Sequence, residues 1–354
     1  MKIIIAAGGT GGHVFPAIST AQELLRSHQV IFFTTDGLAA EIIKKSKFQP
    51  WIVCQKKRSS DNIIIFVIKM IQAARECFYI LRKILPDVVV GFGGYPSFPV
   101  VFAAWILKIP VVIHEQNVVA GRANRLAAMF ASKIAISFDE ASRYFDSKKV
   151  VLTGCPSRFT SNQTRTREDF ESFDFKIGCP TVLVFGGSQA SQRINKAFSE
   201  AAVFFKGNFN FQFIHICGKD DYSKLWKKYS ENKLNFKLFD FFDDIGSAYR
   251  VADLVIARSG ASTISELIAF KKYSILVPYP SEKVHQKENA LVLSNLGVST
   301  VIEDSNLSSN RLYNQILSFF KDKENKINLD KNLFPESDIQ ASQRLAQEVE
   351  RTAF

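Results

Sequence analysis

The chain has 354 residues, which suggests about two domains at ~150 residues each. Hydrophobic residues make up 47% and charged residues 22%, a composition typical of globular proteins with enough apolar residues for two cores. The 45 Lys and Arg residues outnumber the 34 Asp and Glu residues, and the net charge of +11 favours an anionic partner: nucleic acid, acidic lipid or a phosphorylated substrate. The five cysteines include no CxxC pair, which argues against a zinc ribbon or redox motif and suits a reduced, cytosolic chain.

The apolar run at residues 1–5 is too short for a signal peptide, because Gly8 and Gly9 interrupt it. No window approaches the ~20 apolar residues of a membrane span.

Short apolar runs alternate with helical patterns along the first half of the chain. Strands are predicted at residues 2–6, 30–34, 87–90 and 111–114, and a helix at about 14–27 with Pro16 near its first turn. Fully apolar strands between helices indicate a parallel sheet covered on both faces.

The second half repeats this plan. Strands are predicted at 181–185, 211–216, 254–257 and 275–277, and a helix at 193–204. Each half therefore opens with a strand, a Gly-Gly loop and a helix. The pattern predicts an α/β fold of two facing, Rossmann-like, doubly wound domains with a cleft between them. The polar stretch around Pro156 separates domains 1–158 and 159–336, and a helix at about 337–354 is expected to pack back on the first.

Four glycines surround Thr10 in the loop after the first strand, and His13 follows them. Glycines let a backbone approach a ligand, and a helix N-terminus favours an anion, so an anion site is predicted. The dinucleotide fingerprint fails, because its last glycine position is occupied by Val14. The alternative is a tight turn without a ligand. The helix dipole disfavours a charged His13, which makes it a candidate base; the alternative is a capping or packed histidine.

Two further motifs follow strands in the first half. Residues 91–96 (GFGGYP) form either a second wall of the same cleft or a structural turn. Residues 114–117 (HEQN) end the next strand, where polar side chains either reach a ligand or are simply solvated.

In the second half, residues 186–189 (GGSQ) repeat the strand-loop-helix anion geometry. Residues 258–266 (RSGASTISE) place small residues and hydroxyls at a helix start, which suits a diphosphate, and Glu266 could accept bonds from ribose hydroxyls. The alternative is a Ser or Thr N-cap with Glu266 completing a capping box. Asp240, Asp243 and Asp244 are interpreted as a loop and a helix start rather than a metal site.

The stretch 56–85 combines a strongly apolar run with interspersed basic residues. Such a helix can lie in a bilayer interface, attracted by anionic lipid, whereas the alternative is a buried helix that covers the sheet. The predicted membrane-contact residues are Ile63, Ile64, Phe66, Val67, Lys69 and Arg75.

Five runs, taken together and in order, resemble one family: the UDP-N-acetylglucosamine–N-acetylmuramyl-(pentapeptide) pyrophosphoryl-undecaprenol N-acetylglucosaminyltransferases, or MurG family, of glycosyltransferase family 28. The runs are residues 8–16 (GGTGGHVFP), 86–95 (PDVVVGFGGY), 109–117 (IPVVIHEQN), 186–189 and 258–266. They span nearly the whole chain. The resemblance implies a GT-B fold, an inverting reaction without metal or other cofactor, and peripheral attachment to the cytoplasmic face of a bacterial inner membrane.

The resemblance also implies roles for individual residues. Those assigned to substrate binding are Thr10, Gly11 and Gly12 at the cleft, Asn117 and Gln286 at the transferred sugar, Arg158 near the nucleotide, Ser188 with Ala261, Ser262 and Thr263 at the diphosphate, Ile264 and Ser265 in the same helix start, Phe242 at the uracil, and Glu266 at the ribose. The family usually has asparagine where Cys155 stands and often glutamine where His285 stands, which leaves the roles of these two positions open.

The implied substrates are UDP-N-acetylglucosamine and an N-acetylmuramyl-pentapeptide on undecaprenyl diphosphate, whose C4 hydroxyl attacks the donor's anomeric carbon. His13 is the candidate general base and Glu115 the alternative. UDP would leave with help from the helix N-termini after Gly187 and Gly260. An anionic membrane surface and other cell-wall synthesis or division proteins are further candidate partners.

Three rival functions follow from the same residues. A UDP-sugar epimerase would share the fold. A basic nucleic-acid-binding or scaffold protein would use the +11 charge, but no helix-turn-helix or zinc pattern supports nucleic acid as a partner. A dehydrogenase is disfavoured by the failed glycine spacing.

Overall fold

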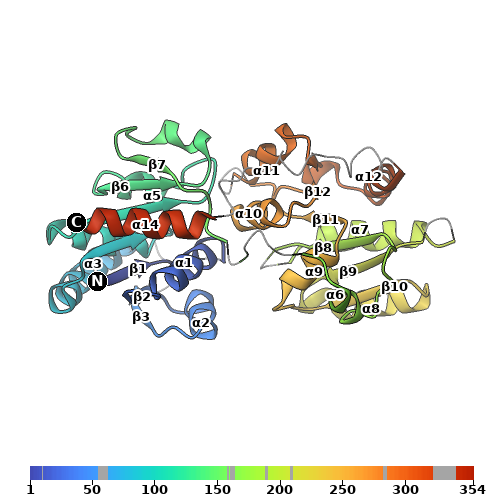
Figure 1. Ribbon diagram of the computed structural model, residues 1–354, viewed down its shortest axis with the longest axis horizontal. Coiled ribbons are helices and arrows are strands. Elements are labelled where there is room, and N and C mark those ends of the chain that lie inside the picture. Colours follow the sequence, from blue (N-terminus) through green and yellow to red (C-terminus); the bar gives the residue numbers. More distant parts are fainter. Residues whose placement is uncertain are drawn as a thin grey trace. The chain divides into compact units, whose positions relative to one another are not determined.

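The chain forms two compact units, each built around its own parallel sheet (Figure 1). A computed structural model describes residues 1–9, 11–54, 63–157, 159, 164–187, 190–207, 210–281, 285–321 and 340–354. Unit 1 comprises Met1–Arg158 and Ser337–Phe354, and unit 2 comprises Phe159–Glu336. The C-terminal segment therefore belongs to the same unit as the N-terminus.

The sheet of unit 1 has the doubly wound strand order. Its strands, in the described residues, are β1 (Lys2–Ala6), β2 (Gln29–Thr35), β3 (Pro50–Cys54), β4 (Val88–Gly91), β5 (Val111–Glu115), β6 (Lys133–Ile136) and β7 (Val150–Leu152). They lie in the order β3-β2-β1-β4-β5-β6-β7. Every pairing is parallel. The direction of strand order reverses between β1 and β4.

Helices cover both faces of this sheet. They are α1 (Gly11–Leu24), α2 (Leu38–Lys45), α3 (Ile63–Ile84), α4 (Ser97–Ile106), α5 (Arg122–Ala127), the 3-10 helix η1 (Asp139–Tyr144) and α14 (Ala341–Ala353). Alternate residues of β1 point to opposite faces, as strand geometry requires. Ile3 and Ile5 pack with α1, α2 and α14, whereas Ile4 and Ala6 pack with α3, α4 and α5. Although α1 and α14 come from opposite ends of the chain, they lie side by side (Figure 1).

Unit 2 repeats the strand order. Its strands, in the described residues, are β8 (Thr181–Phe185), β9 (Gln212–Ile216), β10 (Asn235–Phe239), β11 (Leu254–Ala257), β12 (Ser274–Leu276) and β13 (Ser299–Val301). They lie in the order β10-β9-β8-β11-β12-β13, so the reversal falls between β8 and β11. All pairings are again parallel.

The helices of unit 2 also cover both faces of their sheet. They are α6 (Arg167–Glu171), α7 (Gln192–Phe204), α8 (Lys219–Glu231), α9 (Ile245–Val251), α10 (Ala261–Ala269), α11 (Gln286–Asn295), the 3-10 helix η2 (Asp304–Asn306) and α12 (Ser309–Lys321). Val182 and Val184 of β8 pack with α7, α8 and α12. On the other face, the Phe185 ring contacts Tyr249 of α9. Two parallel, doubly wound sheets confirm the predicted fold class.

The first helix differs from its predicted bounds. It begins at Gly11 rather than about residue 14, and it ends at Leu24 rather than residue 27. Pro16 therefore lies in the second turn, not the first. Glycines carry no apolar side chain, so a pattern of apolar spacing detects this helix only from Val14 onward.

Candidate active site

The two glycine-rich loops of unit 1 touch where its strand order reverses. The loop after β1 contains Gly8, and the loop after β4 contains Gly94, whose φ is +75°. A Cβ on Gly94 would lie 2.7 Å from the carbonyl oxygen of Gly8, so only glycine permits this approach. Ligands of doubly wound sheets bind beyond the carboxyl ends of the strands at such a reversal. The two loops are therefore neighbours in one candidate site.

His13 lies in the first turn of α1, beside the loop that follows β1. Its Nδ1 is 2.9 Å from Oε1 of Gln116, in the segment after β5. The residue is only partly buried. His13 is the third residue of α1 and is therefore not its N-cap, and its hydrogen bond among the described residues goes to Gln116. Gly11 and Gly12 are the first two residues of α1, whereas Thr10 lies outside the described residues.

Glu115, the alternative base, is buried and has both carboxylate oxygens occupied. Its Oε1 accepts from the backbone N–H of Asn117 at 2.9 Å and from that residue's side-chain amide at 3.2 Å. Its Oε2 accepts from the N–H of Gly121 and the amide of Asn124, both at 2.9 Å. Four donors make the carboxylate an organiser of this loop, so His13 is better placed to take a proton.

His114 is a second histidine at the same edge of the sheet. Burial lowers the pKa of His114 from 6.5 to about 4, against the opposing effect of its hydrogen bond to Gly154, and charge on His13 lowers it further. Its Nε2 lies 3.1 Å from the Gly154 carbonyl oxygen, which can only accept. His114 is therefore neutral at pH 7 with its proton on Nε2.

Two helix N-termini lie at the carboxyl ends of the strands of unit 2, after β8 and β11, between which the strand order reverses. α7 follows β8, and α10 follows β11. A Cβ on Gly186 would lie 2.2 Å from the backbone nitrogen of Ser191, the N-cap of α7, so this loop requires glycine. Ser188, between them, lies outside the described residues. The free N–H groups of such helix starts favour an anion.

The capping-box alternative for α10 is wrong. Gly260 is the N-cap and makes no side-chain cap, so Glu266 is not the third helical residue that a capping box requires. Glu266 is instead buried, and its Oε2 accepts a 3.0 Å hydrogen bond from the hydroxyl of Tyr249. Nothing in the sequence pattern singles out Tyr249.

The first turns of α10 carry the residues predicted to bind the diphosphate. Ala261, Thr263, Ile264 and Ser265 are all buried. The Oγ atom of Ser262 is also buried and finds no hydrogen-bond partner within the part of the chain that is described. Such an unpaired hydroxyl at a helix N-terminus suits a polar ligand.

Arg258, at the start of the same motif, has a role that the sequence does not indicate. Its Nη1 donates to Asp304 Oδ1 at 2.6 Å and its Nη2 to Ser191 Oγ at 2.8 Å. Asp304 also pairs with Arg193 at 3.0 Å. The Arg258 side chain is only 9% exposed. The Arg258 guanidinium therefore links the N-cap of α7 to η2, and these hydrogen bonds give it a structural role.

Gln286 is the first residue of α11 and lies next to the loop before α10. Its Oε1 accepts from the N–H of Tyr279 at 3.0 Å, and its carbonyl oxygen accepts from Ser259 Oγ at 2.7 Å. The preceding His285 has a left-handed backbone with φ of +50°. The structure therefore brings Gln286 together with the 258–266 motif.

Two further residues were predicted to contact the nucleotide, Phe242 and Arg158. Phe242 packs on Phe239, with ring centroids 4.4 Å apart. Arg158 lies outside the described residues. Asp244 is the N-cap of α9, accepting from the N–H of Ser247. Within the described ranges, no three His, Cys, Asp or Glu residues gather in a way that could hold a metal ion.

Helix α3 has one buried face and one apolar exposed face. Ala73, Cys77 and Leu81 are at most 5% exposed, and Cys77 and Leu81 pack on the sheet. The exposed hydrophobic side chains, between 42% and 65% exposed, are Ile64, Ile65, Val67, Ile68, Ile71 and Tyr79. No helix in the described ranges has both the length and the apolarity needed to cross a bilayer.

The other predicted membrane-contact residues on α3 differ in exposure. Arg75 is exposed, and its guanidinium carbon lies 5.8 Å from the centroid of the Tyr79 ring. Lys69 is half-buried. Phe66 is half-buried against Tyr95, with ring centroids 6.2 Å apart. The side chain of Ile63 lies outside the described residues.

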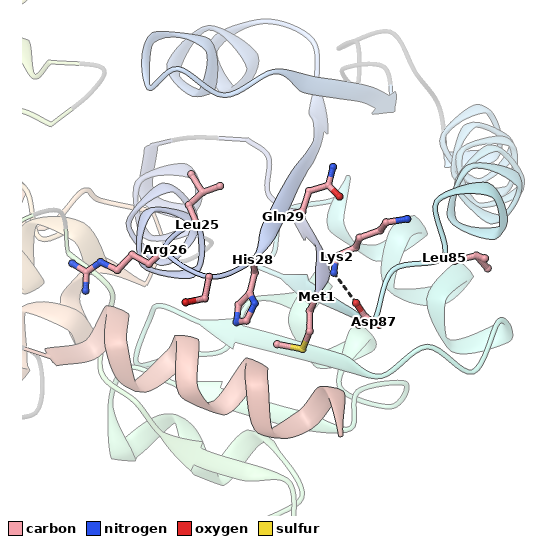
Figure 2. A pocket seen from close by; sticks show the side chains of 9 residues that line it. Met1, Lys2, Leu25, Arg26, His28, Gln29, Leu85 and Asp87 are labelled. Atoms are coloured by element: carbon pink, nitrogen blue, oxygen red, sulfur yellow. Dashed lines mark hydrogen bonds between the residues drawn. The ribbon is translucent and has the colours of Figure 1, made fainter.

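A hollow of about 730 Å³ lies at the opposite edge of the sheet of unit 1 (Figure 2). Its lining includes Met1, Lys2 and Asp87, which precede or begin β1 and β4, and the backbone nitrogen of Lys2 donates to Asp87 at 2.6 Å. His28 also lines it and pairs with Glu350 of α14 at 2.7 Å. Because ligands of this fold bind at the carboxyl ends of the strands, this hollow is not the candidate site.

Comparisons with known proteins match both units to the same family. Sequence models of the glycosyltransferase family 28 N-terminal and C-terminal domains match residues 3–136 and 181–348. A UDP-N-acetylglucosamine–N-acetylmuramyl-(pentapeptide) pyrophosphoryl-undecaprenol N-acetylglucosamine transferase from Thermodesulfovibrio yellowstonii is 38% identical over 325 residues, which is 89% of each chain.

Two solved structures share the fold. MurG from Acinetobacter baumannii has a TM-score of 0.79 at 24% identity, over 99% of this chain and 100% of that one. A UDP-GlcNAc 2-epimerase from Neisseria meningitidis, bound to UDP-GlcNAc, has a TM-score of 0.68 at 12% identity, over 99% of this chain and 100% of that one. At these identities the two structures establish only the fold. The domain matches and the 38% identity go further: the chain belongs to glycosyltransferase family 28, and within it to the UDP-N-acetylglucosamine–N-acetylmuramyl-(pentapeptide) pyrophosphoryl-undecaprenol N-acetylglucosamine transferases.

Proposed function

We propose that this glycosyltransferase moves N-acetylglucosamine from UDP to the C4 hydroxyl of an N-acetylmuramyl-pentapeptide on undecaprenyl diphosphate, a step of peptidoglycan synthesis. The observation that carries the proposal is the 38% identity, over 89% of both chains, to a transferase named for these groups. The matched 325 residues include parts of both units, so the similarity extends to the unit proposed to bind the donor and to the unit proposed to bind the acceptor.

Unit 2 is proposed to bind the donor. The N-terminus of α10 offers free N–H groups, and Ser262 Oγ is buried and unpaired among the described residues, which together suit the diphosphate of UDP. Ser188 and the start of α7 would add a second set of donors. Glu266 would accept from the ribose hydroxyls, held in place by Tyr249. Gln286 would bind the transferred sugar, and Phe242 and Arg158 the nucleotide.

Unit 1 is proposed to bind the acceptor. The glycine loop that begins at Gly8 leads into α1, whose first two residues are Gly11 and Gly12, and would hold the acceptor's diphosphate at the helix N-terminus. Asn117 would contact the transferred sugar. The C4 oxygen attacks the anomeric carbon as its proton passes to His13. The bond from that carbon to the diphosphate oxygen breaks, UDP leaves with the electron pair, and the configuration inverts.

The leaving UDP gains negative charge, which must be stabilised. Oriented N–H groups at the starts of α7 and α10, fixed before the reaction, can stabilise such charge without reorganisation. We therefore propose that transfer proceeds without a divalent cation.

The exposed apolar face of α3 is proposed to lie on the cytoplasmic surface of the membrane that carries the acceptor. Its N-terminal half presents Ile64, Val67, Ile68 and Ile71 at helical spacing. Apolar burial in the interface, together with the net charge of +11, favours an anionic bilayer.

The proposal is tested by following doubly labelled UDP-N-acetylglucosamine, with one label in the sugar and one in the uracil, in the presence of lipid acceptor. Transfer places only the sugar label on the lipid. Isomerisation of the sugar without acceptor would favour a UDP-sugar epimerase instead. Absence of any UDP affinity, with salt-sensitive DNA binding, would favour a nucleic-acid-binding protein.

A further inference from the structure

Four groups at the carboxyl edge of the unit 1 sheet form one chain of hydrogen bonds that ends on His13. The carbonyl oxygen of Gly154 is 3.1 Å from His114 Nε2. Nδ1 of His114 is 3.2 Å from Nε2 of Gln116. Oε1 of Gln116 is 2.9 Å from His13 Nδ1. Each imidazole nitrogen can donate or accept, so the direction of the chain must be derived from its fixed ends.

The first end is fixed by Gly154, because a carbonyl oxygen only accepts. His114 must donate from Nε2, and since it is fully buried and neutral, its Nδ1 carries no proton. That nitrogen is therefore an acceptor and needs a donor from Gln116.

The orientation of the Gln116 amide is fixed by three acceptors around its nitrogen. Nε2 lies 2.9 Å from the carbonyl oxygen of Phe92, 3.2 Å from that of His114 and 3.2 Å from His114 Nδ1. Rotating the amide by 180° would place its oxygen against these acceptors. The Gln116 oxygen therefore faces His13. Gln116 is 0% exposed, and the Phe92 ring packs on His114, so little room exists for another arrangement.

We propose that Gln116 is a positioning residue that holds neutral His13 with its proton on Nδ1 and its Nε2 free of a proton. An amide oxygen can only accept, so a hydrogen bond to it requires the Nδ1 proton of His13. In water, neutral histidine carries its proton mainly on Nε2, the opposite tautomer. The site thus selects the form whose Nε2 can receive a proton, which rests on the proposed role of His13 as base.

The direct test is the tautomer of His13, read from ¹⁵N chemical shifts of the protein labelled at its histidines. The signals of His13 are identified by their loss in His13→Ala. In its neutral form, His13 is expected to show a protonated Nδ1 and an unprotonated Nε2. An Nε2-protonated His13 in the unaltered protein would overturn the inference, and this measurement needs no Gln116 variant to fold.

Two variants of similar size test the cause. Gln116→Met removes the acceptor and is expected to move the His13 proton toward Nε2 and to lower kcat by about 10–100-fold with the donor KM unchanged. Gln116→Glu keeps an acceptor oxygen and is expected to retain the Nδ1 proton. An unchanged tautomer in Gln116→Met would overturn the inference. Full turnover of His13→Ala would instead refute His13 as base, and an absence of sugar transfer would refute the proposed function; neither alters the tautomer result.

Discussion

The hydroxyl of Tyr249 donates to Oε2 of Glu266 at 3.0 Å, and both residues are buried. The two side chains come from different helices, α9 and α10, so the bond fixes the position of the carboxylate between these helices. An ionised carboxylate accepts several hydrogen bonds, so Glu266 is expected to accept from a ligand hydroxyl as well as from Tyr249.

Glu266→Gln is expected to weaken UDP binding by about 10–100-fold, because a hydrogen bond to a charged acceptor contributes roughly 1.5–3 kcal/mol. Titration calorimetry with UDP measures the effect. Tyr249→Phe is the matched control: it removes one bond to the carboxylate but leaves the charge, and is expected to weaken binding by less than about tenfold. Unchanged UDP affinity in Glu266→Gln would remove this residue from the donor site.

His13→Ala is expected to lower kcat by about 10²–10⁴-fold while the donor affinity stays the same, because only the proton acceptor is lost. Steady-state transfer rates at saturating substrates measure the change. His28→Ala serves as the control, since His28 lies at the opposite edge of the sheet (Figure 2) and is expected to retain full turnover. Near-normal turnover of His13→Ala would require another base.

Replacing Ile64, Ile68 and Ile71 of α3 by Asp is expected to weaken binding to anionic vesicles by about 100-fold or more, since each buried aliphatic side chain contributes roughly 1.5–3 kcal/mol. Vesicle sedimentation measures the bound fraction. Phe66 is left unchanged because it packs on Tyr95 and its loss would also disturb folding.

The matched control for this surface places Asp at Ile177 and Trp226 of unit 2, which are 64% and 49% exposed. This variant is expected to bind vesicles as the unaltered protein does. If the α3 variant also bound unchanged, the exposed face of α3 would not be the membrane contact.

Arg258→Met is expected to destabilise unit 2 by about 3 kcal/mol, because it leaves Asp304 buried with fewer partners. Urea unfolding measures the loss. Arg167→Met is the control: its pair with Glu171 is exposed on both sides, so removing it should cost at most about 0.5 kcal/mol. Equal stability of the two variants would show that the Arg258–Asp304 pair is not a structural link.

Stability is expected to fall as the pH is lowered from about 6.5 toward 4. Burial lowers the pKa of His114 to about 4 and that of His215 to about 3, both from 6.5. Below pH 6.5 these two histidines are protonated in the unfolded chain but remain neutral in the folded protein. Their contribution to the free energy of unfolding is therefore complete above pH 6.5 and is lost on acidification. Urea midpoints across this range measure the decline. His215→Gln is expected to make the decline shallower; an identical pH profile would contradict this.

The central strands were predictable because they are continuous apolar runs buried on both faces. The bounds of β1, β8 and β11 match their predictions. The edge strands β3, β7, β10 and β13 were missed. Each has a neighbour on one side only, β7 and β13 have just three residues, and Lys237 interrupts the apolar pattern of β10. The internal strand β6 was missed because its four residues begin with a lysine and include an alanine.

The candidate site was predictable as separate motifs but not as a network. The glycine loops and helix starts are local patterns, whereas the His13–Gln116 bond joins residues 103 apart and the Arg258–Asp304 bond joins residues 46 apart. Local spacing carries no information about such pairs. It also suggested a capping role for Glu266 that the actual start of α10 excludes.

Fixed backbone N–H groups at the starts of α7 and α10, rather than a divalent cation, are proposed to stabilise the departing UDP. The most direct measurement is the initial rate of sugar transfer to the lipid acceptor, with added Mg²⁺ in one arm and with excess EDTA in the other. Equal rates are expected in both conditions, because the N–H groups act without a metal ion. Loss of turnover in EDTA, restored by added Mg²⁺ or Mn²⁺, would contradict this proposal.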